Sequence, residues 1–421
     1  MATQAGLVDT LRNRNFLILW VGQLVSQTGD QFATIAMLML VNNLTDSTLP
    51  LAILALSLTL PQIFFGLLGG VFVDRLNRKT VMIASDVVRG LAILAVLFVQ
   101  RADQLYVLYL AIFTMSTVGA FYYPARNAAI PNIVPEEMLL TANTLIQGSQ
   151  LLALIFGVSA AGLTVGWLGT SFAFAFDAAT FGASAVAILM IPIPPLANRP
   201  AQASARVIWD QLMEGLRYIK NSAPLTNVLG ITSAATLGFG ATLILGLKYL
   251  DLELGISAQE LSFLYLFLAS GMVVGGVILN HLSSRVEINY VVGACIASLG
   301  LAIIVFALSP SYPLVLVAVV IIGVTIVAAR ATLATITQAL VPDEKRGRVE
   351  SAVNMVIGAS TSAAMALSGV LGDLIGVQAA FVSAGVVTLF SGVAATFVLR
   401  GAAAALRAKK AMTESMVATG S

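Results

Sequence analysis

The sequence predicts an all-α polytopic membrane protein with twelve transmembrane helices in two pseudo-symmetric bundles of six. Composition is the first reason: of 421 residues, 58% are hydrophobic and 10% are charged, whereas a soluble domain carries roughly 25% charged residues. Apolar runs of about 20 residues also recur along the chain, and each could cross a hydrocarbon core of roughly 30 Å as a helix. Helices are expected because a bilayer requires every backbone polar group to be satisfied internally.

The apolar runs fall into two sets of six, separated by the least hydrophobic stretch of the chain. The predicted helices lie near 16–41, 49–72, 80–99, 105–125, 141–166, 170–191, 225–248, 260–281, 288–308, 312–334, 348–371 and 377–399. We therefore predict an N-terminal bundle over 1–191, a linker over 192–222, a C-terminal bundle over 223–400 and a tail over 401–421. Within the linker, Val207 to Ile219 has the apolar spacing of a helix lying on a membrane surface.

Lysine and arginine concentrate on one side of this predicted topology, in the loops and ends that share a side with the N-terminus. That bias predicts that both termini are cytoplasmic and that the protein is a multi-pass protein of the bacterial inner membrane. The net charge of +2 and its dispersal give no reason to expect nucleic-acid binding. Cys295 is the one cysteine, which excludes a disulfide framework. A monomer is the default expectation.

An internal repeat relates the two sets of helices. Gly69 and Gly70 match Gly275 and Gly276, and the segment that begins at Arg126 matches the one that begins at Arg330. A period close to half the chain is typical of transporters built from two parallel repeats.

The loop after the second predicted helix carries a recognisable motif. Residues 69–79 read GGVFVDRLNRK, which resembles the signature G-x-x-x-D-R-x-G-R-K of the major facilitator superfamily, with Asn77 where the family has glycine. The resemblance implies a fold of two six-helix bundles with the substrate site between them. It also implies a conformational latch made of Gly70, Asp74, Arg75, Arg78 and Lys79, in which Asp74 pairs with Arg126. The alternative is that the basic residues serve topology alone.

Three stretches narrow the resemblance to the branch of macrolide-efflux proteins and enterobactin exporters, of the drug:proton antiporter type. They are residues 14–32, RNFLILWVGQLVSQTGDQF, residues 121–145, FYYPARNAAIPNIVPEEMLLTANTL, and residues 174–181, FAFDAATF. Antiporters of the superfamily often carry G-P-x-x-G-G in the fifth helix. Here residues 157–162 read GVSAAG, without the proline, so antiport is not implied by that motif.

Four ionisable residues lie within predicted helices of the first half, where charge is costly and therefore suggests function. Asp86 and Arg89 are spaced i, i+3 and can neutralise each other. Asp30 and Asp177 both lie about 21 Å from the cytoplasmic ends of their helices. All four are candidates for proton coupling. Asp30 is preferred, because a carboxylate removed from water can exchange a proton; a plain buried hydrogen bond is the alternative.

Polar and large apolar residues on the predicted cavity helices are candidates for substrate contact. They are Gln23, Ser26, Gln27, Thr236, Phe239, Asn354 and Met355. The predicted cavity lining of the second half is almost uncharged, which suits a bulky amphipathic substrate.

The chain has no G-x-x-x-x-G-K-[ST] motif and no metal-ligand cluster, so we expect neither an enzyme nor a cofactor. We expect a secondary-active efflux transporter that exports a drug, macrolide or siderophore-like molecule by alternating access, with the proton gradient as energy source. Its expected partners are the lipid bilayer and the substrate. The alternatives are a lipid or lysolipid translocase of the same fold, and a transport-inactive membrane sensor or scaffold.

Overall fold

A computed structural model describes residues 6–73, 76–194, 205–282 and 287–404, and these residues are helical almost throughout, with no strand among them. Nine segments of this part of the chain are long and apolar enough to cross a membrane. The predicted all-α polytopic membrane fold is thus confirmed, whereas the count of twelve spans is not. Helices α2 (Arg14–Leu44) and α4 (Arg78–Val96), which carry deep polar side chains, are not among the nine.

The chain divides into two compact units. Unit 1 comprises Met1–Asp46, Ile53–Ile208 and Ile256–Leu266, and unit 2 comprises Ser47–Ala52, Trp209–Gly255 and Phe267–Ser421. The first turn of α3 (Leu49–Val73) therefore clusters with unit 2, and the first turns of α10 (Ala258–Leu282) cluster with unit 1.

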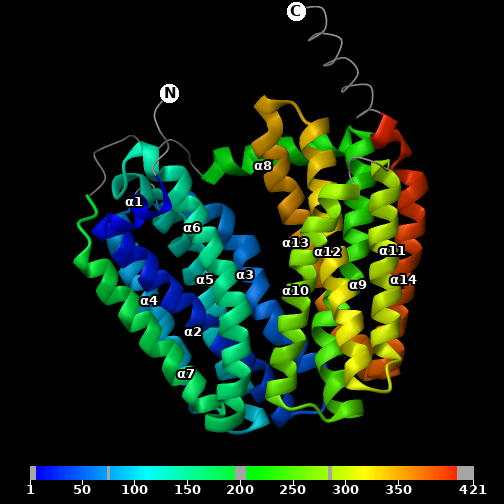
Figure 1. The fold of residues 1–421 in the computed structure, drawn as a ribbon, viewed down its shortest axis with the longest axis horizontal. Coiled ribbons are helices and arrows are strands. Elements are labelled where there is room, and N and C mark those ends of the chain that lie inside the picture. Colours follow the sequence, from blue (N-terminus) through cyan, green and yellow to red (C-terminus); the bar gives the residue numbers. More distant parts are fainter. Residues whose placement is uncertain (1–5, 74–75, 195–204, 283–286, 405–421) are drawn as a thin grey trace, which may run out of the picture. The chain divides into compact units, whose positions relative to one another are not determined.

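Unit 1 is a helical bundle in which α7 (Val158–Met190) packs along α2 and α4, and α4 packs along α5 (Leu105–Ala129) (Figure 1). Its other helices and turns are α1 (Leu7–Arg12), η1 (Ala102–Gln104), η2 (Ile130–Asn132), η3 (Glu136–Met138), α6 (Leu139–Leu152) and the π-helix η4 (Ala153–Gly157). Gly169 has a φ of 81° within α7. Only glycine adopts this conformation readily. The residue interrupts the helix at the boundary predicted between the helices near 141–166 and 170–191.

Unit 2 repeats the packing scheme of unit 1: α14 packs along α9 and α11, and α11 packs along α12 (Figure 1). In addition, α13 packs along α9. The helices are α8 (Ala205–Lys220), α9 (Ala223–Leu254), α11 (Ile288–Ala307), α12 (Tyr312–Leu340), α13 (Asp343–Ile375) and α14 (Val377–Val398). The shared scheme is what the internal repeat predicts.

Two helices of unit 2 are longer than their apolar runs suggest. Helix α12 continues to Leu340 rather than ending near 334, and α13 begins at Asp343 rather than near 348. Arg330 and Glu350, which the predicted spans already include, therefore lie farther inside their helices, about 15 and 10 Å from the helix ends at 1.5 Å per residue. The expectation of an almost uncharged lining in the second half is wrong, because Arg330, Arg346 and Glu350 line a cavity of unit 2.

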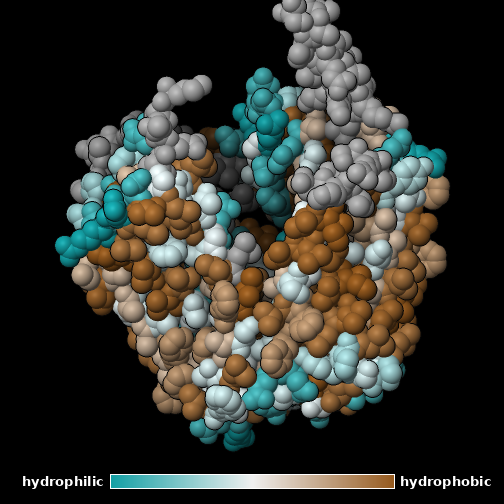
Figure 2. All heavy atoms as spheres, in the orientation of Figure 1, coloured by the Kyte–Doolittle hydropathy of each residue, from teal (hydrophilic) through white to brown (hydrophobic). Residues whose placement is uncertain are grey.

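Large apolar side chains cover the outside of the helices. Val273, Val277, Phe390 and Phe397 are each more than half exposed, and Figure 2 shows brown residues along the sides of the helices and teal residues toward their ends. Exposed apolar surface of this kind would be unfavourable in water and suits contact with lipid.

Candidate functional site

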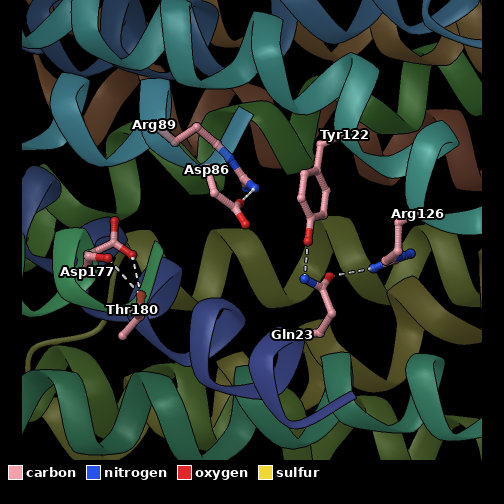
Figure 3. A network of polar contacts seen from close by, with 7 residues as sticks. All are labelled: Gln23, Asp86, Arg89, Tyr122, Arg126, Asp177 and Thr180. Carbon is pink, nitrogen blue, oxygen red and sulfur yellow. Dashed lines mark hydrogen bonds and ion pairs between the residues drawn. The ribbon is translucent and has the colours of Figure 1, made fainter. Parts of the chain in front are cut away.

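An ion pair between Arg89 and Asp86 of α4 lies in the interior of unit 1 (Figure 3). Asp86 is 1% exposed and Arg89 is 5% exposed. The guanidinium carbon of Arg89 lies 4.4 Å from the ring centre of Tyr122 on α5 and 4.4 Å from that of Phe181 on α7. These rings stabilise the cation through their negative faces. The predicted pairing of Asp86 with Arg89 is confirmed.

Two further carboxylates share the electrostatic field of Arg89. Asp30 on α2 and Asp177 on α7 both interact with Arg89 and with each other. Asp177 is fully buried; one oxygen accepts a hydrogen bond from Thr180 Oγ1 at 3.4 Å, and the other has no partner in the described part of the chain. Helices α2 and α7 approach closely at Gly29, where a Cβ would lie 2.6 Å from Asp177 Oδ1. One guanidinium thus pairs directly with Asp86 and attracts Asp30 and Asp177 at longer range.

A second polar chain extends from the same tyrosine toward Arg126. Gln23 on α2 donates a hydrogen bond to the hydroxyl of Tyr122 and accepts one from Arg126 Nη1 at 3.3 Å (Figure 3). Arg126 also donates to Asn127 Oδ1 at 3.0 Å, and it is 4% exposed. Because Tyr122 contacts both Arg89 and Gln23, the two buried arginines are joined through two side chains, Tyr122 and Gln23.

Two other polar residues of α2, both predicted to contact substrate, are also buried. Ser26 is 4% exposed and Gln27 is 9% exposed. Neither polar atom of the Gln27 amide has a hydrogen-bond partner among the described residues. Since an unpaired buried amide is costly, Gln27 is available to bind a water or a polar group of a ligand.

Unit 2 contains a cavity of about 430 Å³ between α9, α11, α12 and α13. Thr236, Phe239 and Asn354 line it, as do Arg330 and Glu350. Met355, also proposed as a contact, is not among the lining residues, and Gln23, Ser26 and Gln27 lie in unit 1. Such a volume is typical of a small-molecule site.

Comparison with known proteins decides the class of this molecule. Residues 5–420 match the model of the transmembrane secretion effector family, part of the major facilitator superfamily. The chain belongs to this family. As a member of the major facilitator superfamily it is a membrane transporter of the efflux type that acts on small molecules, and it is not an enzyme.

Its relatives and structural neighbours agree with this. Macrolide efflux protein A of Streptococcus pyogenes is 24% identical over 379 residues, covering 88% of this chain and 92% of that protein. The multidrug efflux pump Tap of Mycolicibacterium fortuitum is 26% identical over 405 residues, covering 94% and 98%. The fold is similar to that of a bacterial homologue of the iron transporter ferroportin, with a TM-score of 0.73 at 15% identity over 93% of this chain and 98% of that one.

The loop motif of the superfamily is only partly visible. Gly70 lies in the last turns of α3, whereas Asp74 and Arg75 lie outside the described residues. The pairing of Asp74 with Arg126 therefore stays a prediction. Asn77, which departs from the family's glycine, caps α4 by accepting hydrogen bonds from the backbone of Lys79 at 3.0 Å and Thr80 at 3.3 Å.

The basic residues of the motif bind helix ends. Arg78 Nη1 donates to the carbonyl of Ala128 in the last turn of α5 at 2.7 Å. Lys79 Nζ donates to the carbonyls of Leu189 and Ile191, at the end of α7, at 2.8 Å each. Carbonyls at a helix C-terminus lack partners and carry partial negative charge, so these cations tie α4 to its neighbours in the bundle.

Sequence reasoning missed Arg330 and Glu350 as cavity residues because it placed both near the ends of their predicted helices, 312–334 and 348–371. The internal repeat offered a signal, since Arg330 occupies the position that matches the buried Arg126. Hydropathy ends the predicted helix near 334, four residues beyond Arg330, whereas the backbone continues helically to Leu340.

Proposed function

We propose that this transporter is a secondary-active exporter that moves a bulky amphipathic molecule outward by alternating access, in exchange for protons. The observation that supports proton coupling is the group formed by Arg89 with Asp30, Asp86 and Asp177. It places more carboxylates than cations in the interior of one bundle.

The charge imbalance favours proton uptake. Three ionised carboxylates outnumber the two buried arginines of this interior, Arg89 and Arg126, and would leave an excess negative charge in a medium of low dielectric constant, where unpaired charge is costly. Binding a proton at Asp30 removes part of that excess and leaves Arg89 to its partner Asp86 on the same helix. Release of the proton restores the attraction between Asp30 on α2 and Arg89 on α4. Protonation thus changes how strongly two helices of unit 1 attract each other.

The relatives' names support a drug-like substrate, because they are described as macrolide and multidrug efflux proteins. The cavity of unit 2 agrees in character, since its walls are mostly apolar with a few polar groups. We further propose a monomer in the bacterial inner membrane with both termini cytoplasmic, which the one-sided distribution of lysine and arginine supports.

The test uses the purified protein in sealed liposomes loaded with a pH-sensitive dye. Erythromycin is added under an imposed pH gradient, and substrate-dependent proton movement and erythromycin flux are measured together. We expect coupled flux in the wild type and its loss in Asp30→Asn. Asp103→Asn is the matched control, because Asp103 is an exposed acid with a surface ion pair to Arg101.

Undiminished coupling in Asp30→Asn would remove Asp30 from the mechanism. Movement of labelled lysolipid without proton flux would favour the lipid translocase instead.

A further inference from the structure

The cavity of unit 2 presents one basic and one acidic side chain from different walls. Arg330 comes from α12 and Glu350 from α13. Both residues are exposed and line the cavity, and neither forms an ion pair within the part of the chain that the structure describes. The third charged lining residue, Arg346, differs because it pairs with Asp343 at 2.6 Å.

The remaining walls are mostly apolar. Val228, Leu229, Leu299, Ile326 and Leu333 line the cavity, as does Phe239. Uncharged polar side chains also line it, at Thr232, Thr236, Thr337, Gln338, Asn354 and Thr361. A ligand that fills this space contacts hydrocarbon over most of its surface and meets charge without an ion-pair partner among the described residues at Arg330 and Glu350.

The two charges constrain the ligand jointly. A ligand with a single charge would pair with one of these two side chains and gain no charged hydrogen bond from the other. A ligand with one anionic and one cationic group pairs with both. The two side chains come from different helices and form no ion pair with each other among the described residues, so each can pair with a different group of the ligand.

We propose that this cavity binds an amphipathic zwitterion, with its acidic group at Arg330, its amine at Glu350 and an aromatic or aliphatic body against Phe239. This assignment rests on the proposed export of amphipathic molecules and specifies the chemical class of one substrate group.

A matched series of probes tests the assignment by binding to the full-length protein in nanodiscs. Norfloxacin carries a carboxylate and a piperazine amine at opposite ends of an aromatic frame. Its methyl ester keeps the amine alone, and its N-acetyl derivative keeps the carboxylate alone. We expect norfloxacin to bind on the order of ten-fold more tightly than either derivative, since one charged hydrogen bond is worth about a factor of ten or more.

The variants assign each charge to one side chain. Arg330→Gln should lower norfloxacin affinity to that of the ester and leave ester binding unchanged, while Arg330→Lys should retain most of the preference. Glu350→Gln should lower norfloxacin affinity to that of the N-acetyl derivative. Arg217→Gln and Glu344→Gln are matched controls, because both residues are exposed and neither lines the cavity. Equal binding of the three probes, no binding of any of them, or equal effects of the controls would overturn the assignment.

Binding and transport separate this inference from the proposed function. If norfloxacin binds with the expected pattern but no proton-driven flux occurs, the zwitterion site stands and the antiport proposal fails. If erythromycin flux is proton-driven but the three probes bind alike, the antiport proposal stands and the zwitterion site fails.

Discussion

Replacing Arg89 with glutamine removes a cation that attracts Asp30, Asp86 and Asp177. Glutamine keeps part of the side-chain volume and can still donate a hydrogen bond, so the main change is the loss of charge. Asp86, at 1% exposed, is then left as a buried carboxylate without its partner.

The expected cost follows from that burial. Breaking a buried ion pair by removing one partner costs about 3–5 kcal/mol of unfolding free energy. The cation–π contacts with Tyr122 and Phe181 are lost as well, at about 0.5–2 kcal/mol each. Asp86→Asn should cost less, about 1–3 kcal/mol, because Arg89 keeps its attraction to Asp30 and Asp177. The double variant should be no less stable than Arg89→Gln alone, since it leaves no unpaired Asp86.

A double-mutant cycle measures this directly. Unfolding free energies of the wild type, both single variants and the double variant are determined by steric trapping in bicelles. We expect the two substitutions to be non-additive by about 2 kcal/mol, as is usual for residues in contact. Additivity within about 0.5 kcal/mol would show that Asp86 and Arg89 do not depend on each other, and the charge argument for unit 1 would then be refuted.

Three further substitutions test helix packing and capping. Gly215→Leu should detach α8 from α13, because a Cβ at Gly215 overlaps the carbonyl of Arg348. Glu214→Ala removes only a half-exposed ion pair, worth about 0–1 kcal/mol, so the protease sensitivity of α8 should rise in Gly215→Leu alone. Asn77→Ala removes the cap of α4 and should cost about 1 kcal/mol of unfolding free energy, measured by thermal unfolding. Gly162→Val should overpack α7 against the start of α10, at a cost of about 1–3 kcal/mol, also measured by thermal unfolding.

Each of these has an internal control. Asn77→Asp should retain the cap and most of the stability, because aspartate caps as well as asparagine. Gly182→Ala adds a Cβ to the same helix as Gly162 at a place with nothing within 4 Å, so it should not destabilise the protein. Equal loss of stability in Gly182→Ala and Gly162→Val would show that close approach of the helices is not the cause. A protease-sensitive α8 in Glu214→Ala would show that the ion pair, rather than the close contact, holds that helix.

Local patterns were enough to predict several elements of the structure. The apolar runs place the helices, and the linker segment Val207 to Ile219 lies within the observed α8. The i, i+3 spacing of Asp86 and Arg89 predicts an ion pair that the structure contains. These predictions succeed because helix geometry alone determines which side chains are neighbours along one helix.

The sequence by itself thus determined the membrane class, the helices and the charged pair on α4. Only the tertiary structure decided that Asp30 and Asp177, from two other helices, share the field of Arg89. It also decided that Arg330 and Glu350 face one cavity. The reason is physical: these relations depend on how closely α2 approaches α7 at Gly29, and on how α12 and α13 pack with α9 and α11 around the cavity. Neither arrangement is encoded in the spacing of residues along a single helix.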